Sequence, residues 1–281
     1  MATGALEGKV AIVTGAGSII GMGRVMALAL VNAGARVTMM DVDEDSVEQT
    51  ANDARELAGD DSVHVVIGDV SSPDDAERCV RETIDRMGGL HVLVNNAGIS
   101  LTSGGLSGRP QQPFWDLTPE AWNRMMAVNL TGPFLLARAA VRHMMEQQWG
   151  RIIGVTTSMD TMYRAYGVPY GQTKAGHEAF IAAIAQELED TGVTANVLVP
   201  GGAANTNFFP TDTDRDRTKL VQPEVMRAPI VWLASEASDG YNGMRFIGAR
   251  WDETVPLAQR IEASGAPAAW PQLGRQAIRA D

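Results

Sequence analysis

Cysteine is almost absent from this sequence, in which Cys79 is the only one. An intrachain disulfide is therefore excluded, and so is a metal site built from several cysteines. We expect no metal site of any kind. A chain without disulfides suits a reducing compartment, so we predict that the protein is cytoplasmic.

Long apolar runs and positive charge are also scarce. No stretch of about 18 apolar residues occurs, and the N-terminal residues MATGALEGKVAIVTGAG lack the pattern of a secretory signal. The chain has 23 Lys and Arg against 34 Asp and Glu, a net charge of -11. Binding to nucleic acid needs clustered basic side chains, so we expect neither a nucleic acid nor a membrane as partner.

The overall composition is that of one globular domain: 281 residues, of which 45% are hydrophobic and 20% are charged. No change in composition along the chain indicates a linker between two domains. Short β-branched runs alternate with longer segments of helical period. The expected strands are KVAIVT, RVTMMD, SVHVVIGD, LHVLVNN, RIIGVTT, TANVLVP and MRFIGA. Such alternation predicts βαβ units, hence an α/β fold with a parallel sheet and helices on both faces.

The second half of the chain predicts several further elements. A long helix is expected from about 119 to 148 with an interruption near Gly132 and Pro133, another from about 168 to 190, and a third from about Pro223. The segments 99–113 and 201–219 are rich in Gly, Ser, Pro, Asp and Thr, which predicts loops. Both follow strands at their carboxyl ends, the edge at which open α/β sheets bind ligands.

The segment TGAGSIIGMG, residues 14–23, follows the first expected strand and opens the first helix. Glycine in such a turn lets the backbone approach a pyrophosphate, which then accepts hydrogen bonds from the helix N-terminus. The alternative is a glycine-rich turn without a ligand. The position of this glycine-rich segment in a βαβ unit favours the interpretation that it binds a dinucleotide.

Asp41 ends the second expected strand. A carboxylate at this place can accept hydrogen bonds from the adenosine ribose hydroxyls and would repel a 2′-phosphate. The neighbouring Asp43, Glu44 and Asp45 add to that repulsion, although they also suit the cap and acidic first turn of the next helix. The sequence therefore predicts NAD in preference to NADP.

Tyr170 and Lys174 stand one helical turn apart, so both side chains point to one side of a helix. A nearby ammonium stabilises a phenolate, so we expect Lys174 to lower the pKa of Tyr170 from its usual value of about 10. The pair would then serve as an acid/base. An ordinary packing pair is the alternative.

With these motifs in order, residues 9–249 resemble the short-chain dehydrogenase/reductase family. The resemblance implies one Rossmann-like domain over 1–281, a doubly wound sheet with a C-terminal extension at 250–281. It also implies hydride transfer between a nicotinamide and a carbonyl carbon, with Tyr170 exchanging the proton of the oxygen. The matching segments are TGAGSIIGMG, Asp69-Val70, Asn95 to Gly98, VNLTG, GRIIGVTTS, YGQTK and NVLVPGG.

The resemblance assigns roles residue by residue. Asp69 would lie near the adenine, Asn129 would hold a water in a proton relay, and Lys174 would also bind the nicotinamide ribose. The catalytic candidates are Asn129, Thr157, Ser158, Tyr170 and Lys174. The candidates for binding the cofactor are Gly15, Ser18, Ile20, Gly21, Met22, Asp41, Asp69, Val70, Asn96, Ala97, Gly98, Pro200, Gly201 and Gly202, together with Tyr170 and Lys174.

The sequence departs from the family pattern at three places. The glycine motif has two extra residues between Gly15 and Gly21. The position of the usual catalytic serine falls on Thr157, with Ser158 adjacent, and both stay candidates. The apolar tail 250–281 could wrap a neighbouring subunit, close the active site or pack on the surface.

The expected substrate is a small alcohol or carbonyl compound. Aromatic residues such as Phe208 and Phe209 suggest an apolar or ring-bearing substrate. An anionic substrate is the alternative, because four arginines are candidates for binding it: Arg109, Arg164, Arg215 and Arg217. The alternatives to an NAD-dependent enzyme are an NADPH-dependent ketoreductase and a non-catalytic dinucleotide sensor. Apolar stretches at 134–141 and 179–185, and the resemblance, predict a homodimer or homotetramer.

Overall fold

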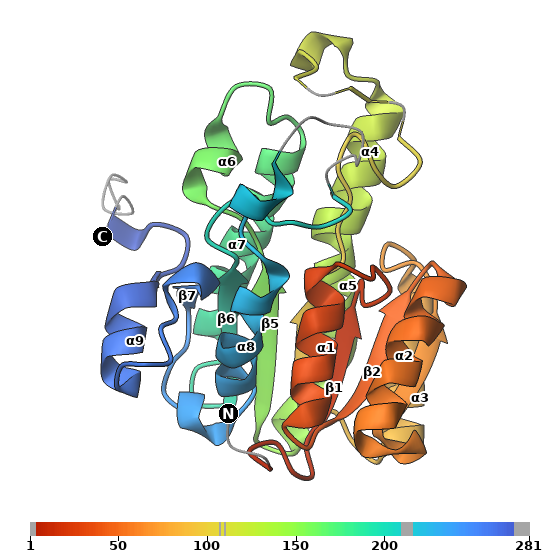
Figure 1. Cartoon of the computed structure of the whole chain (residues 1–281), viewed down its shortest axis with the longest axis vertical. Coiled ribbons are helices and arrows are strands. Elements are labelled where there is room, and N and C mark those ends of the chain that lie inside the picture. The colour runs from red at the N-terminus through yellow and green to blue at the C-terminus, as the bar shows by residue number, and fades with distance from the viewer. Residues whose placement is uncertain (1–3, 107, 110, 209–215, 273–281) are drawn as a thin grey trace, which may run out of the picture.

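The apolar runs of the sequence form one eight-stranded sheet in the computed structural model, which describes residues 4–106, 108–109, 111–208 and 216–272 (Figure 1). The strand order is β3-β2-β1-β4-β5-β6-β7-β8, with β1 to β7 parallel and β8 antiparallel to β7. The predicted fold class is confirmed. The bounds are β1 Val10–Thr14, β2 Arg36–Asp41, β3 Val63–Ile67, β4 Val92–Asn95, β5 Gly150–Val155, β6 Val193–Val199, β7 Met244–Ile247 and β8 Gly265–Pro267.

Helices cover both faces of this sheet. One layer, at the front of Figure 1, consists of α1 (Met22–Asn32), α2 (Glu44–Ala58) and α8 (Arg227–Leu233); the other consists of α3 (Pro73–Met87), α5 (Gly132–Glu146) and α7 (Tyr170–Glu187). Successive residues of a strand point to opposite faces of the sheet: Val13 packs in the core on the α1 side, and Ile12 packs in the core on the opposite face. Burial on both faces explains why the strands are apolar throughout. None of the helices in the described ranges is long and apolar enough to span a membrane.

The long helix expected from 119 to 148 is broken, but one turn earlier than predicted. It consists of α4 (Pro119–Met126), a π-helical turn (Ala127–Thr131) and α5. Pro133 has no N–H to donate to the carbonyl of Asn129, four residues earlier, and the N–H of Gly132 bonds instead to the carbonyl of Ala127. The proline therefore shifts the hydrogen-bond register at Asn129.

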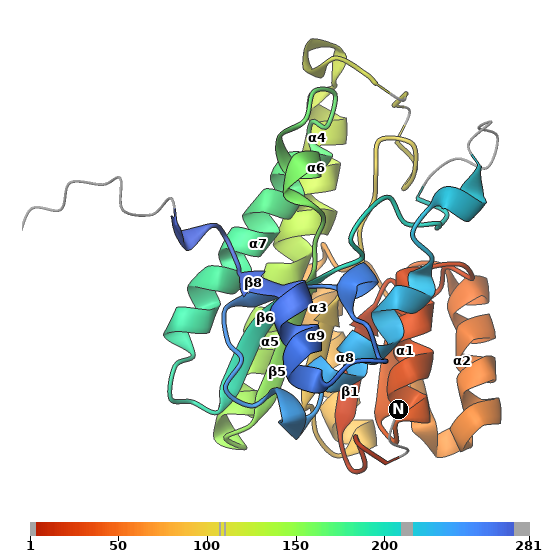
Figure 2. The ribbon, with the colours of Figure 1, turned by 60° about the vertical axis from the view of Figure 1, so that its left-hand side comes forward.

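The described part of the C-terminal extension packs on the edge of the sheet (Figure 2). Beyond β7, helix α9 (Leu257–Ser264) leads into β8, which pairs Gly265 with Phe246. Trp251 is only 8% exposed, and its ring lies 4.9 Å from that of Trp232 on α8. Residues 250–272 therefore pack on the chain's own surface, and contact with a neighbouring subunit stays a prediction.

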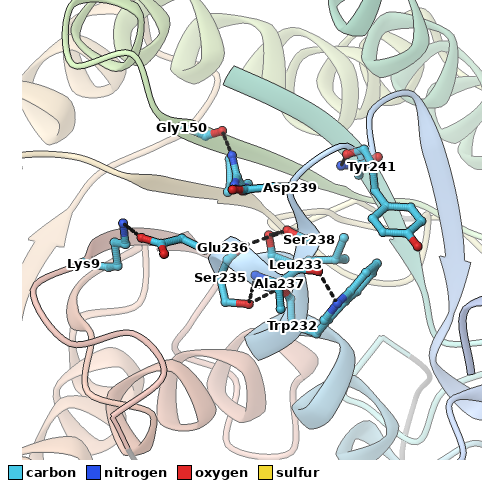
Figure 3. A network of polar contacts seen from close by, with 12 residues as sticks. Lys9, Gly150, Trp232, Leu233, Ser235, Glu236, Ala237, Ser238, Asp239 and Tyr241 are labelled. Atoms are coloured by element: carbon cyan, nitrogen blue, oxygen red, sulfur yellow. Dashed lines mark hydrogen bonds and ion pairs between the residues drawn. The ribbon is translucent and has the colours of Figure 1, made fainter. Parts of the chain in front are cut away.

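The amino edge of the sheet is closed by a network of structural contacts (Figure 3). Lys9 forms an ion pair of 3.3 Å with Glu236, and the indole N–H of Trp232 donates to the carbonyl of Ala237 at 3.1 Å. Ser238 donates to the carbonyl of Leu233 at 3.0 Å. These contacts occupy the lower end of the molecule in Figure 1, whereas the long insertions of the chain rise above the carboxyl edge.

Candidate active site

A cavity of about 560 Å³ lies along the carboxyl edge of the sheet, at the point between β1 and β4 where the strand order reverses. Open α/β sheets bind ligands at such a switch point. Ile20, Asn129, Ser158 and Gly201 do not line it. The predicted residues that do line it are Gly15, Ser18, Gly21, Met22, Asp41, Asp69, Val70, Asn96, Ala97, Gly98, Thr157, Tyr170, Lys174, Pro200 and Gly202.

The turn between β1 and α1 requires glycine at two positions. Gly15 has a φ of +66°, and a methyl group there would lie 2.8 Å from the Cα of Ala97. A methyl group at Gly23 would collide with the carbonyl oxygen of Gly15. The first turn of α1 has no acidic residue, and the N-cap residue Gly21 offers no side chain to its N–H groups. These N–H groups are therefore available to an anion at the mouth of the turn.

Ser18 supplies the test of whether this turn fits a pyrophosphate. Its hydroxyl is buried, lines the cavity and has no hydrogen-bond partner within the described part of the chain. Leaving a buried hydroxyl unpaired is unfavourable, and an oxygen atom of a phosphate would satisfy it. The two extra residues of the motif, Ile19 and Ile20, are exposed on the outside of the turn. The turn therefore fits a phosphate, with Ser18 as a donor beside the helix N-terminus.

Asp41 lies at the end of β2, where its carboxylate is fixed by backbone donors. It accepts hydrogen bonds of 2.8 Å from the N–H groups of both Gly17 and Val42. Asp43 caps α2 by accepting from the N–H of Ser46 at 3.2 Å, so the capping alternative describes Asp43 but not Asp41. Because both acids also line the cavity, this end of it is negative.

The carboxylate of Asp69 is held in place by hydrogen bonds and an ion pair with neighbouring residues. It accepts from the backbone and the hydroxyl of Ser71 at 2.9 and 2.7 Å, and forms an ion pair of 2.8 Å with Arg124 on α4. Burial alone would raise the pKa of Asp69, but these hydrogen bonds and the Arg124 charge hold it below its usual value. Arg124 was not predicted, because an arginine in an amphipathic helix carries no signal of its partner.

Tyr170 and Lys174 meet in the same wall of the cavity, at the start of α7. Lys174 is 4% exposed, and its ammonium donates to the carbonyl of Val155 at 2.9 Å while lying 6.0 Å from the centre of the Tyr170 ring. Burial lowers the pKa of Lys174 to about 8. The helical spacing thus brings the pair together, with the ammonium directed at the end of β5.

The expected lowering of the Tyr170 pKa is wrong for this state of the protein. Burial raises the pKa of Tyr170 to about 12, and the opposing effects come from a hydrogen bond with Thr157 and the charge of Arg164. The Lys174 ammonium, which bonds the carbonyl of Val155, does not offset the effect of burial. At neutral pH the phenol is therefore protonated.

The two candidates for the third catalytic position have different surroundings. The Thr157 hydroxyl lies within hydrogen-bonding reach of the Tyr170 hydroxyl and faces the cavity. Ser158 instead shares a hydrogen bond of 2.9 Å with Thr161, at the start of the short helix α6 (Met159–Tyr163). This helix was missed, since five residues carry no period to detect.

Asn129 is completely buried and links two elements of the site. Its amide oxygen accepts from the N–H of Ile99 at 2.8 Å, and its amide nitrogen donates to the carbonyl of Ile99 at 2.9 Å and to Thr173 on α7 at 3.3 Å. The side chain therefore fixes the loop after β4 against the helix of Tyr170.

The loop after β6 covers the substrate end of the cavity. The ring of Phe208 lies 4.9 Å from that of Tyr170, and the hydroxyl of Ser100 donates to its carbonyl at 3.4 Å. Arg109 is paired with Asp116 at 2.9 Å, and Arg217 donates to Asn205 and to the carbonyl of Thr206. Phe209 and Arg215, also candidates from the sequence, lie outside the described residues.

Comparison with known proteins agrees with this geometry. A family model described as short chain dehydrogenase matches residues 9–216. The 3-oxoacyl-[acyl-carrier-protein] reductase FabG of Vibrio cholerae is 33% identical, over 82% of this chain and 91% of its own. L-Rhamnose-1-dehydrogenase of Scheffersomyces stipitis is 28% identical over 87% and 96%. The crystal structure of a metagenomic short-chain oxidoreductase in complex with NADP superimposes with a TM-score of 0.71 at 25% identity, covering 86% of this chain and 97% of the other.

Proposed function

Because the chain belongs to the short-chain dehydrogenase family, whose members bind a nicotinamide dinucleotide and act on CH–OH groups, we propose that it is an NAD-dependent enzyme interconverting a secondary alcohol and a ketone or aldehyde. The observation that carries the proposal is that Thr157, Tyr170 and Lys174 line one cavity together with Pro200 and Gly202. The glycine turn with its unpaired Ser18 lies in the same cavity.

The proposed mechanism uses Tyr170 as the proton donor in the reducing direction. Its phenol is protonated at neutral pH and gives its proton to the carbonyl oxygen as that oxygen gains charge. Thr157 hydrogen-bonds the same oxygen and holds it against Tyr170, while the Lys174 ammonium lies 6.0 Å from the centre of the Tyr170 ring. A nicotinamide bound in the cavity would supply the hydride in the reducing direction and accept it in the oxidising direction.

Several residues would hold the dinucleotide. Ser18 and the first N–H groups of α1 suit the pyrophosphate, Asp41 suits the adenosine ribose, and Lys174 suits the nicotinamide ribose. The contacts of Asp69 with Ser71 and Arg124 fix its carboxylate in the cavity wall, where it would lie beside the adenine. Asn129 would act through the loop at Ile99 and the position of Tyr170.

The preference for NAD rests on charge at the adenosine end. Asp41 and Asp43 line that end, and Arg124, the one arginine that lines it in the described part of the chain, is paired with Asp69. A 2′-phosphate would meet carboxylates without a free cation. The NADP in the metagenomic relative and the FabG similarity favour NADPH as the second candidate.

Measured dissociation constants for the two reduced cofactors decide between them. The native protein should bind NADH at least about tenfold more tightly than NADPH, and Asp41→Ser should remove most of that difference. Asp43→Ser is the matched control, since Asp43 caps α2, and it should change the ratio little. Tighter binding of NADPH by the native protein would assign it to the second candidate.

The catalytic proposal is tested by NADH formation over a panel of secondary alcohols. Tyr170→Phe should lower kcat by roughly 10²- to 10⁴-fold while NADH still binds. Tight NADH binding without turnover of any alcohol or ketone would instead indicate a non-catalytic dinucleotide sensor.

We also propose a homodimer or homotetramer in the cytoplasm. The outer faces of α5 and α7 expose apolar surface: Phe134 is 45% exposed, Met145 is 42% exposed, and the ring of Phe134 contacts that of Phe180 on α7. Exposed apolar surface of this kind is typical of subunit contacts. Light scattering should give two or four times the mass of one chain, and a monomer would contradict the proposal.

A further inference from the structure

The cavity is polarised along its length. The acidic residues that line it, Asp41, Asp43 and Asp69, all lie at the adenosine end. Around Tyr170 the described lining contains no carboxylate, and its charged members are Lys174 and Arg164. The described lining near Tyr170 is therefore basic, although the net charge of the whole chain is -11.

Arg164 differs from these other arginines because its guanidinium has no partner among the residues that the structure describes. Arg124 is paired with Asp69, Arg109 with Asp116, and Arg217 is bonded to the loop at Asn205. Within the described ranges, no hydrogen bond or ion pair involves the side chain of Arg164, which is exposed to the cavity. Asp160, the nearest acid along the chain, accepts instead from the hydroxyl of Tyr163 at 2.9 Å.

The backbone of Arg164 is held in place by its neighbours. It follows α6 directly, and its carbonyl accepts from the N–H of Gly167 at 3.2 Å. Its charge acts on the Tyr170 phenol, whose pKa it lowers against the effect of burial. Arg164 and Tyr170 line the same cavity, so one small molecule bound there could contact both side chains.

We propose that Arg164 binds an anionic group of the substrate, a carboxylate or a phosphate, so that the substrate is an acidic alcohol or its keto counterpart. A guanidinium has two parallel N–H donors that match two anionic oxygens, and in a cavity it binds them more strongly than in water. Thr161 and Asn207 line the same end and can donate further hydrogen bonds. This inference rests on the proposed function, whose reacting oxygen lies at Tyr170.

Binding to the NADH complex tests the inference without turnover, because an alcohol cannot reduce NADH. The NADH fluorescence is followed while the protein is titrated with 3-hydroxybutyrate, mandelate and 1-(4-carboxyphenyl)ethanol, each against its methyl ester, and with glycerol 3-phosphate against glycerol. At least one anionic compound should bind about tenfold more tightly than its neutral partner. Comparing the hydroxy acids with the phosphate ester shows whether Arg164 prefers a carboxylate or a phosphate.

Arg164→Gln should weaken binding of the preferred anion by about tenfold and leave its neutral partner within about twofold. Arg164→Lys should keep part of the preference. Arg109→Gln is the matched control, because it removes the same charge from an arginine already paired with Asp116, and it should alter neither affinity.

Two results would overturn the inference: no anion binds more tightly than its neutral partner in the native protein, or the preference survives in Arg164→Gln. Failure of the proposed function looks different. In that case an anion preference that depends on Arg164 persists, but NAD is not reduced with any member of the panel.

Discussion

Arg245 on β7 donates a hydrogen bond of 3.0 Å to the carbonyl oxygen of Thr157, beneath the cavity. The guanidinium also forms an ion pair of 3.4 Å with the completely buried carboxylate of Glu178 on α7. Glu178 in turn accepts from the hydroxyl of Thr156 at 2.9 Å and from the N–H of Ala269 in the C-terminal extension at 3.4 Å. One buried ion pair thus connects the end of β5, the helix of Tyr170 and the extension.

Arg245→Met should therefore impair both stability and turnover. It leaves the Glu178 charge buried without its partner, which costs about 3 kcal/mol of unfolding free energy, and it releases the backbone of Thr157. We expect kcat to fall while the dissociation constant for NADH stays within about twofold. Urea unfolding and steady-state kinetics measure the two effects.

The double variant Arg245→Met/Glu178→Leu separates these effects. It removes both charges, so part of the lost stability should return, because an apolar pair can replace a buried ion pair, although the hydroxyl of Thr156 and the N–H of Ala269 lose their acceptor. The kcat should stay low, since the hydrogen bond to Thr157 is still missing. Recovery of kcat together with stability would show that the pair stabilises the fold without positioning Thr157.

Thr157→Val and Ser158→Ala should differ strongly in activity. Valine keeps the shape of threonine but cannot hydrogen-bond the reacting oxygen, so kcat should fall by about 10²-fold. Ser158 bonds Thr161 and not Tyr170, so its loss should change kcat by less than about threefold. Initial rates at saturating NAD compare them, and a larger loss in Ser158→Ala would transfer the catalytic role to Ser158.

The Tyr170 phenol should titrate far above neutral pH in the cofactor-free protein. Its pKa is raised by burial to about 12, so ultraviolet difference titration against Tyr170→Phe should show no phenolate from this residue below about pH 10. Arg164→Gln removes a charge that favours the phenolate and should move the pKa still higher. A Tyr170 phenolate already present at pH 8 would contradict the structure.

Ser18→Ala should weaken NAD binding without destabilising the protein. The serine hydroxyl is buried and unpaired within the described residues, so its removal costs no intramolecular hydrogen bond. The dissociation constant for NADH should rise by about tenfold, and the urea midpoint should stay equal or increase. An unchanged affinity would place the pyrophosphate away from Ser18.

The strands and the glycine turn follow from local signals. Apolar runs buried on both faces are continuous in the sequence, and Gly15 is needed at a positive φ. Strand ends therefore fall within one or two residues of their predicted places. The break at Asn129 was placed one turn late, because Pro133 acts on the hydrogen bond four residues before it.

Long-range contacts explain most of what the sequence does not predict. The ion pair of Arg245 and Glu178 joins positions far apart in the chain, and the pairing of β8 depends on where the tail meets β7. The pKa of Tyr170 likewise depends on burial, on the hydrogen bond with Thr157 and on the charge of Arg164, not on the spacing of Tyr170 and Lys174 in the sequence.

His177 should make the fold sensitive to acid. It is completely buried on α7, both ring nitrogens are without hydrogen-bond partners among the described residues, and its Nε2 would lie 2.8 Å from a methyl group at Gly154. Burial, with a smaller contribution from the Lys174 charge, lowers the pKa of His177 well below 6.5. The imidazole is therefore neutral in the folded protein.

As the pH falls below about 6.5, the unfolded chain binds a proton at His177 that the folded protein excludes, so stability declines by up to about 1.4 kcal/mol per pH unit from this residue. His177→Leu removes both the site that binds this proton in the unfolded chain and the two buried ring nitrogens of the folded protein. Its unfolding free energy should equal or exceed that of the native protein at pH 7 and decline less steeply between pH 6.5 and 5. His64→Gln is the control, because His64 is partly exposed beside Glu82 and should leave the steep decline in place. The same steepness in His177→Leu would show that another group causes the acid sensitivity.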